Sequence, residues 1–226
     1  MRDTYHDELD SLGRQIVEMT RLVGSAMSRA TTALLDADLE LAENVIAGDD
    51  RIDLLHRDLE SRAYELLARQ QPVARDLRTI VTSLRMSADL ERMGDLASHV
   101  AHVARRRYPN SAVPDELHAT ILEMGQVAQR IVAKVGSVIA ARDVPSALEL
   151  DRDDDAMDRL HRRLFTVLLD QSWDHGVEPA IDVILVGRYY ERFADHAVSV
   201  AARLVYLVTG EHAGDLPSPA ATARAD

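Results

Sequence analysis

The sequence contains no cysteine among its 226 residues, and only 4% of its residues are aromatic. Without cysteine the chain cannot form a disulfide framework, a thiolate metal site or a catalytic thiol, which agrees with a reducing, cytoplasmic environment. The scarcity of aromatic residues disfavours a sheet core built on large cross-strand pairs. The hydrophobic fraction is nevertheless 46%, rich in Ala, Leu and Val, which suits a packed helical core.

The chain also lacks a basic excess and a long apolar run. It has 26 Lys and Arg against 38 Asp and Glu, and the net charge of −12 repels a nucleic-acid backbone, so we expect no nucleic-acid partner. The most apolar windows, 181–186 and 198–208, are shorter than the ~18 uninterrupted apolar residues of a membrane-spanning helix. The polar N-terminus has no apolar stretch of a secretory signal. These absences predict a cytoplasmic protein with no direct membrane span.

Apolar residues recur at alternating steps of three and four, the spacing of an amphipathic helix. The pattern predicts an all-α fold of six helices. Their approximate ranges are 3–36, 39–70, 73–107, 115–141, 146–170 and, after a loop through Gly176 and Pro179, a last helix ending near Gly210. The stretch 108–114 contains two prolines and is the clearest boundary. We therefore expect two tandem, pseudo-symmetric three-helix bundles, residues 1–108 and 109–210, followed by a disordered tail, 211–226.

One short motif occurs twice. Glu91-Arg92-Met93-Gly94-Asp95 and Glu191-Arg192-Phe193-Ala194-Asp195 lie 191 − 91 = 100 positions apart, each in a segment predicted to be helical. Residues at i and i+4 share one helix face, so two carboxylates there repel each other unless a cation lies between them. The duplicated pair therefore predicts a metal site in each half.

A second pair of acids precedes each motif. Asp49 and Asp53 lie on the second predicted helix, and Asp154 and Asp158 lie on the fifth. In an antiparallel bundle each pair would face the acids of the following helix, so four carboxylates would meet in each half. Oxygen ligands favour hard or borderline cations and can bridge more than one ion. Iron, manganese, magnesium and zinc all remain open.

Leu77, Leu84 and Ala88 project along the same stripe of the third helix as Glu91 and Asp95. This pattern predicts that the two acids continue the line of an apolar seam at the point where it opens to solvent. The alternative is that such acid pairs lie on a solvated surface and are neutralised by a neighbouring Arg92 or Arg192.

Two stretches resemble the PhoU family, the accessory and regulatory proteins of phosphate transport systems. The first is Asp76-Leu77-Arg78 followed by Asp89-Leu90-Glu91-Arg92-Met93-Gly94-Asp95. The second is Tyr190-Glu191-Arg192-Phe193-Ala194-Asp195-His196-Ala197 followed by Val205-Tyr206-Leu207-Val208-Thr209-Gly210. The likeness extends over both halves.

The resemblance implies two tandem three-helix bundles that carry multinuclear iron or zinc clusters on Glu91, Asp95, Glu191 and Asp195, with Asp49, Asp53, Asp154 and Asp158 as the earlier pairs. It also implies a negative regulator that couples the ATPase subunit of a phosphate importer to a membrane sensor histidine kinase. A homodimer remains open. This chain has Tyr189 where the first copy has Asp89, and Phe193-Ala194 in place of Met93-Gly94, which predicts a weaker second cluster.

Two other functions remain as alternatives. A carboxylate-bridged di-metal enzyme of the ferritin-like kind needs Glu-x-x-His on two helices, and no Glu in this sequence has His three residues later. A metal-free helical scaffold would leave the acids without a ligand. His56 and His161 recur one turn beyond the earlier acid pairs and are candidates for a nitrogen ligand or a supporting hydrogen bond, whereas His99 and His196 have no equivalent in the other copy. Trp173 is expected to close the end of the second bundle.

Overall fold

The computed structural model describes residues 2–216, and within that range the chain forms helices and no strand. The all-α prediction is therefore confirmed. The long helices are α1 (Arg2–Leu35), α2 (Leu39–Gln70), α3 (Ala74–Arg107), α4 (Asp115–Ala141), α6 (Leu150–Leu168) and α7 (Val177–Thr209), with the short α5 (Val144–Leu148) and the 3-10 helix η1 (Ala213–Asp215). The disordered tail was predicted from residue 211, but its first residues pack against α7 as η1, and residues 217–226 lie outside the described residues.

Local sequence explains where several helices begin and end. The Asp38 carboxylate caps α2 by accepting a hydrogen bond from the Leu41 backbone N–H at 2.9 Å. Gly210 follows α7 with a φ of 84°, in the left-handed region that a residue without Cβ adopts without strain. Pro179, predicted to lie in a loop, instead lies in the first turn of α7, where a missing backbone N–H breaks no helical bond.

The predicted fifth helix, 146–170, is divided in two. The Asp143 side chain accepts a hydrogen bond from the Ser146 backbone N–H at 3.2 Å and starts α5. The Glu149 N–H then bonds to the Ser146 carbonyl at 3.4 Å, a tighter turn than that of an α-helix, and α6 begins at the next residue.

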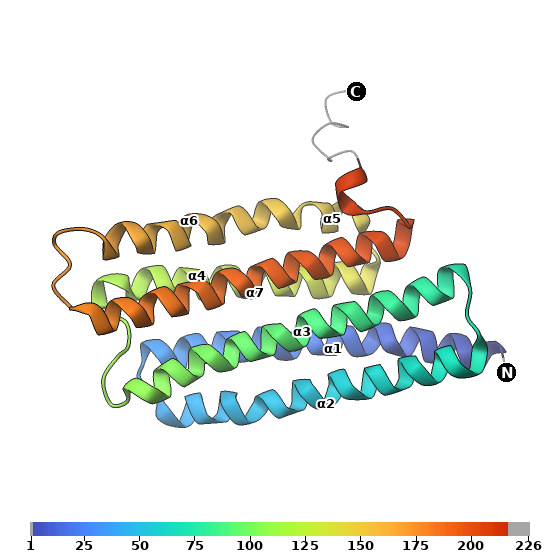
Figure 1. The fold of residues 1–226 in the computed structure, drawn as a ribbon, viewed down its shortest axis with the longest axis horizontal. Coiled ribbons are helices and arrows are strands. Elements are labelled where there is room, and N and C mark those ends of the chain that lie inside the picture. The colour runs from blue at the N-terminus through green and yellow to red at the C-terminus, as the bar shows by residue number, and fades with distance from the viewer. Residues whose placement is uncertain (1, 217–226) are drawn as a thin grey trace.

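The six long helices form two groups of three that lie side by side, α1, α2 and α3 in one and α4, α6 and α7 in the other (Figure 1). The groups meet because α1 packs against α4 and α3 packs against α7. The buried apolar side chains form one cluster that includes residues of both halves. The linker between α3 and α4 thus divides the repeat but not the hydrophobic core. No helix among residues 2–216 is both long and apolar enough to cross a membrane.

Close contacts fix the approach of the two groups. Gly125 on α4 lies directly against α1, where a Cβ would come within 2.7 Å of the Thr31 side chain. The Thr31 hydroxyl in turn shares a 2.6 Å hydrogen bond with the Tyr190 hydroxyl on α7, and the Tyr190 side chain is fully buried. A polar link between the halves therefore lies inside the shared core.

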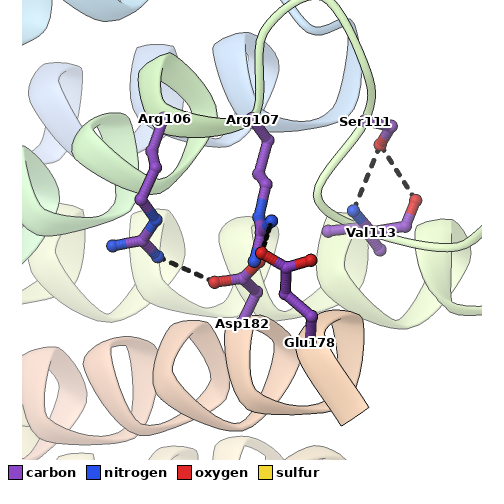
Figure 2. A network of polar contacts seen from close by, with 6 residues as sticks. All are labelled: Arg106, Arg107, Ser111, Val113, Glu178 and Asp182. Atoms are coloured by element: carbon purple, nitrogen blue, oxygen red, sulfur yellow. Dashed lines mark hydrogen bonds and ion pairs between the residues drawn. The ribbon is translucent and has the colours of Figure 1, made fainter. Parts of the chain in front are cut away.

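A second link joins the end of α3 to the beginning of α7. Figure 2 shows Arg106 and Arg107 reaching toward α7, where Arg106 Nη2 lies 2.7 Å from Asp182 Oδ1. Arg107 pairs with both Asp182 and Glu178. Asp182 is only 2% exposed, so its charge depends on these two guanidinium groups.

Candidate functional site

Helices α2 and α3 bring the four predicted acids of the first half into one groove. Burial and then the charges of Asp95, Asp53 and Glu91 together raise the pKa of Asp49 to about 6, against an opposing effect of the Ser98 side chain. The pKa of Glu91 is also raised, first by burial and then by Asp95. Each pair of acids thus lies within electrostatic reach of the other pair, as the antiparallel arrangement of the two helices predicts.

Gly94 allows α2 to approach α3 at the base of this groove. A Cβ at residue 94 would lie 2.8 Å from Asp49 Oδ1 and 3.0 Å from Ile52 Cδ1. Asp49 Oδ1 is buried and has no hydrogen-bond partner. A buried carboxylate oxygen without a donor is uncommon in a folded protein, and it marks a position where a cation or proton is favoured.

Helices α6 and α7 repeat the arrangement in the second half. Burial and then the charges of Asp195, Asp158 and Glu191 together raise the pKa of Asp154 to about 7. Asp154 Oδ1 is likewise buried without a hydrogen-bond partner. Asp158 and Asp195 are exposed, so the second cluster is more open to solvent than the first.

Arginines occupy part of each cluster. Arg92 Nη1 donates to Asp95 Oδ2 at 2.8 Å, and Arg92 Nε lies 3.6 Å from Glu91 Oε2. In the second half Arg188 pairs with Glu191. Within residues 5–216, no group of three or more His, Asp or Glu side chains is arranged to hold a metal ion as it stands. Bound metal would therefore require these acids to turn away from their arginines.

The acids do not continue a buried apolar seam, so that part of the sequence interpretation is wrong. Leu77 is 41% exposed and Ala88 is also exposed. The buried side of α3 instead includes Ile80, Leu90 and Met93. The reason is that α3 packs against α1, α2 and α7, so buried residues surround most of the helix and no single stripe describes its core side.

The two recurring histidines differ in their partners. His56 Nδ1 lies 3.1 Å from the Ser87 hydroxyl, beside the first cluster. In the second half the position 100 residues after Ser87 is Gly187, and His161 lies against it: a Cβ there would be 3.2 Å from His161 Cδ2. His161 Nε2 is buried and has no hydrogen-bond partner. The second cluster therefore has an imidazole nitrogen without a hydrogen-bond partner nearby. The sequence alone did not show this difference between His56 and His161.

Asp89 and His196 belong to a link that the sequence analysis missed. Asp89 Oδ2 accepts a hydrogen bond from Arg203 Nε at 2.6 Å, and Asp89 Oδ1 lies 3.2 Å from His196 Nδ1. Burial would raise the pKa of Asp89, but these hydrogen bonds and charges hold it below its usual value. Asp89 thus faces α7 and not the carboxylate cluster. The presence of Tyr189 at the equivalent position, where its ring packs against His99, removes no acid from the second cluster.

Trp173 lies in the loop before α7 and is half-buried against the core. Its indole Nε1 donates to the Gly176 carbonyl at 2.8 Å, and its ring contacts His175. These contacts agree with the expected role of closing the end of the second bundle.

The fold and the clusters define a class of protein: an all-helical chain made of two similar halves, each with four carboxylates collected between two of its helices. The family model described as the PhoU domain matches this chain twice, over residues 16–104 and 121–204, once in each half. The chain belongs to the PhoU family.

Curated relatives and solved structures agree with this assignment. The chain is 50% identical over 210 residues to phosphate-specific transport system accessory protein PhoU homolog 2 of Mycobacterium tuberculosis, covering 93% of this chain and 99% of the relative. It is 48% identical to PhoU homolog 1 of Mycobacterium leprae, over 95% and 97% of the two chains. The crystal structure of PhoU from Pseudomonas aeruginosa superposes with a TM-score of 0.80 at 30% identity, over 92% of this chain and 100% of that chain.

Proposed function

We propose that this chain is a metal-binding regulatory adaptor that restrains phosphate uptake and phosphate-starvation signalling. In this proposal it couples the ATPase subunit of a phosphate importer to a membrane sensor histidine kinase and catalyses no reaction itself. The description of its relatives as accessory proteins of phosphate-specific transport systems supports the link to a transporter. A cytoplasmic location follows from the proposed ATPase partner.

The metal proposal rests on one carboxylate oxygen in each cluster that has no hydrogen-bond donor. Asp49 Oδ1 and Asp154 Oδ1 are both buried without a donor, and each lies among three further carboxylates. An oxygen-rich set of this kind fits iron, zinc, manganese or magnesium, with iron or zinc favoured by the family resemblance. The bound cations would neutralise the clustered charges and free Arg92 and Arg188 for other contacts.

The continuous core favours a regulatory change at the surface over a change in the angle between the halves. Rotating one half would separate buried contacts such as the Thr31–Tyr190 hydrogen bond. If the acids of the clusters exchanged their arginine partners for a metal ion, only exposed or half-buried side chains would move. A ligand shifts a conformational equilibrium only if it binds the two states with different affinity, and the alternative arginine and metal partners supply such a difference.

Metal analysis tests the first part of the proposal. The double variant Asp49→Asn and Asp154→Asn should lose most of the bound metal per chain, measured by mass spectrometry of the purified protein. Glu40→Gln with Glu43→Gln is the matched control, because both acids are exposed on α2 and lie outside the clusters. Equal background metal in all three proteins would instead favour the metal-free scaffold. Metal together with turnover of dioxygen would favour the di-metal enzyme.

Binding experiments test the second part. The tagged chain should enrich both the importer ATPase subunit and the sensor histidine kinase, and the ratio of the two should change between high and low phosphate. Absence of both partners at either phosphate level would contradict the adaptor function. Light scattering on the same preparation tests whether the chain forms a homodimer.

A further inference from the structure

A pocket of about 340 Å³ lies between α3, α7 and η1, on the side of α3 that faces the second half. Its polar lining comes from Thr82 and Arg85 on α3, Ser199 and Arg203 on α7, and His212 before η1. No acidic residue lines it. Because the whole chain carries a net charge of −12, this local excess of cationic groups marks a site for an anion.

The guanidinium groups in the pocket retain free donors. Arg85 is exposed and forms no ion pair or hydrogen bond within the described residues. Arg203 uses Nε to bind Asp89, which leaves its two Nη groups without a recorded partner. Arg78 lies behind the pocket wall, with Cζ 5.8 Å from the centre of the Tyr206 ring, and its positive charge offsets the Asp89 carboxylate that pairs with Arg203.

Thr82 supplies a donor of a different kind. Its side chain is 3% exposed, and its hydroxyl forms no hydrogen bond within the described residues. Thr20 and Thr31, which are buried to a similar extent, both donate to a backbone carbonyl of the preceding turn. A hydroxyl on an otherwise buried residue that lacks even this local bond and borders a cationic pocket is a donor available to a ligand.

We infer that this pocket binds a phosphate-type oxyanion through the Arg85 and Arg203 guanidinium groups and the Thr82 hydroxyl. Arginine matches the oxygens of phosphate with parallel N–H donors, and donors from two helices and a loop surround a tetrahedral ion better than a planar carboxylate. The bound ion would link α3 of the first half to α7 of the second. The site is separate from the carboxylate clusters and does not depend on the proposed metal binding.

Calorimetric titration of the full-length protein with sodium phosphate tests the inference, at constant ionic strength and both with and without EDTA. We expect saturable binding in both conditions. Arg85→Gln and Thr82→Val should each weaken it at least ~10-fold, because each removes one hydrogen-bond donor from the pocket. The matched control is Arg75→Gln, an exposed arginine of α3 outside the pocket, which should bind phosphate as the original chain does. Circular dichroism confirms that each variant is folded.

The same titration with a nucleoside monophosphate distinguishes a site for free inorganic phosphate from a site for a phosphate monoester. Tighter binding of free phosphate assigns the pocket to inorganic phosphate, and tighter binding of the nucleotide assigns it to a phosphate monoester. The inference is overturned if neither ligand binds saturably, or if Arg75→Gln weakens binding as much as Arg85→Gln. Binding that disappears with EDTA would place the anion on metal in the carboxylate clusters and would also overturn it.

Discussion

Gly94 controls how closely Asp49 approaches α3. Replacement by Ala should push Asp49 and Ile52 away, because the new methyl group would lie 2.8 Å and 3.0 Å from their side chains. Overpacking of this kind costs about 1–3 kcal/mol. We expect Gly94→Ala to lower the free energy of unfolding by that amount in urea titration.

Gly48 provides the control for this prediction. It lies on α2 next to Asp49, and a Cβ there would contact nothing within 4 Å. Because alanine is a better helix former, Gly48→Ala should raise stability by about 0.5–1 kcal/mol. Equal destabilisation by Gly48→Ala and Gly94→Ala would contradict the close contact at Gly94 as the cause.

The raised pKa values of Asp49 and Asp154 predict how stability depends on pH. In the folded, metal-free protein these values are about 6 and about 7, above the ordinary value of 3.8. Between these limits the folded chain retains protons that the unfolded chain has released, so stability should fall as pH rises from about 4 to about 7. Thermal unfolding in EDTA across this range measures the trend.

Asp154→Asn tests the origin of the trend. The amide resembles the protonated carboxyl, so the variant should be more stable than the original chain at about pH 8 and nearly equal to it at about pH 4.5. The exposed Asp155→Asn on the same helix should leave the pH dependence unchanged. A steeper loss of stability with rising pH in Asp154→Asn would contradict the assignment of the raised pKa to this residue.

At the scale of elements, α3 and α7 are equivalent helices that pack against each other in opposite directions. Asp89, in the middle of α3, meets Arg203 late in α7, and Arg106 at the end of α3 meets Asp182 near the start of α7. The repeat in the sequence predicted both helices and their acids. It did not predict these links, because Asp89 and Arg203 are 203 − 89 = 114 positions apart and belong to different copies.

The Thr31–Tyr190 hydrogen bond connects α1 to α7 inside the core. Tyr190→Phe removes the hydroxyl without changing the ring, and Thr31 keeps its second bond, to the Met27 carbonyl at 2.8 Å. We therefore expect a modest loss of about 0.5–1.5 kcal/mol in chemical denaturation. Tyr64→Phe, whose exposed hydroxyl contacts only Glu60, should change stability far less. Equal effects of the two substitutions would mean that the buried link contributes nothing of its own.

At the scale of the whole molecule, the shared core predicts that both halves unfold together. Trp173, the only tryptophan, reports on the second half, whereas far-ultraviolet circular dichroism reports on all helices. The two signals should give the same midpoint in urea, because the buried cluster includes residues of both halves.

A substitution in the first half sharpens this test. Ile16 is 1% exposed on α1, and Ile16→Val should cost about 0.5–1.5 kcal/mol. Its effect should shift the Trp173 fluorescence transition as much as the circular dichroism transition. A fluorescence midpoint that stays in place while the dichroism changes would indicate that the halves unfold independently.

The sequence by itself determined the six long helices and the duplicated acid pairs, because helical periodicity and i, i+4 spacing are local properties of the chain. The break within residues 146–170 escaped this reasoning, since Pro145 indicated a helix start without showing that the helix would end at Leu148. The eight acids were predicted from their repeat, and each set of four lies together because short connections make α2 and α3, and α6 and α7, antiparallel neighbours.

Only the tertiary structure decided what each polar side chain contacts. It directed Asp89 toward His196 and Arg203, placed His161 against Gly187 without a hydrogen-bond partner, and brought Arg85 and Thr82 to a pocket with residues of α7. These contacts join segments roughly 25 to 130 residues apart, so no local pattern specifies them. They depend on how α3 and α7 pack across the single core, which is a property of the whole chain.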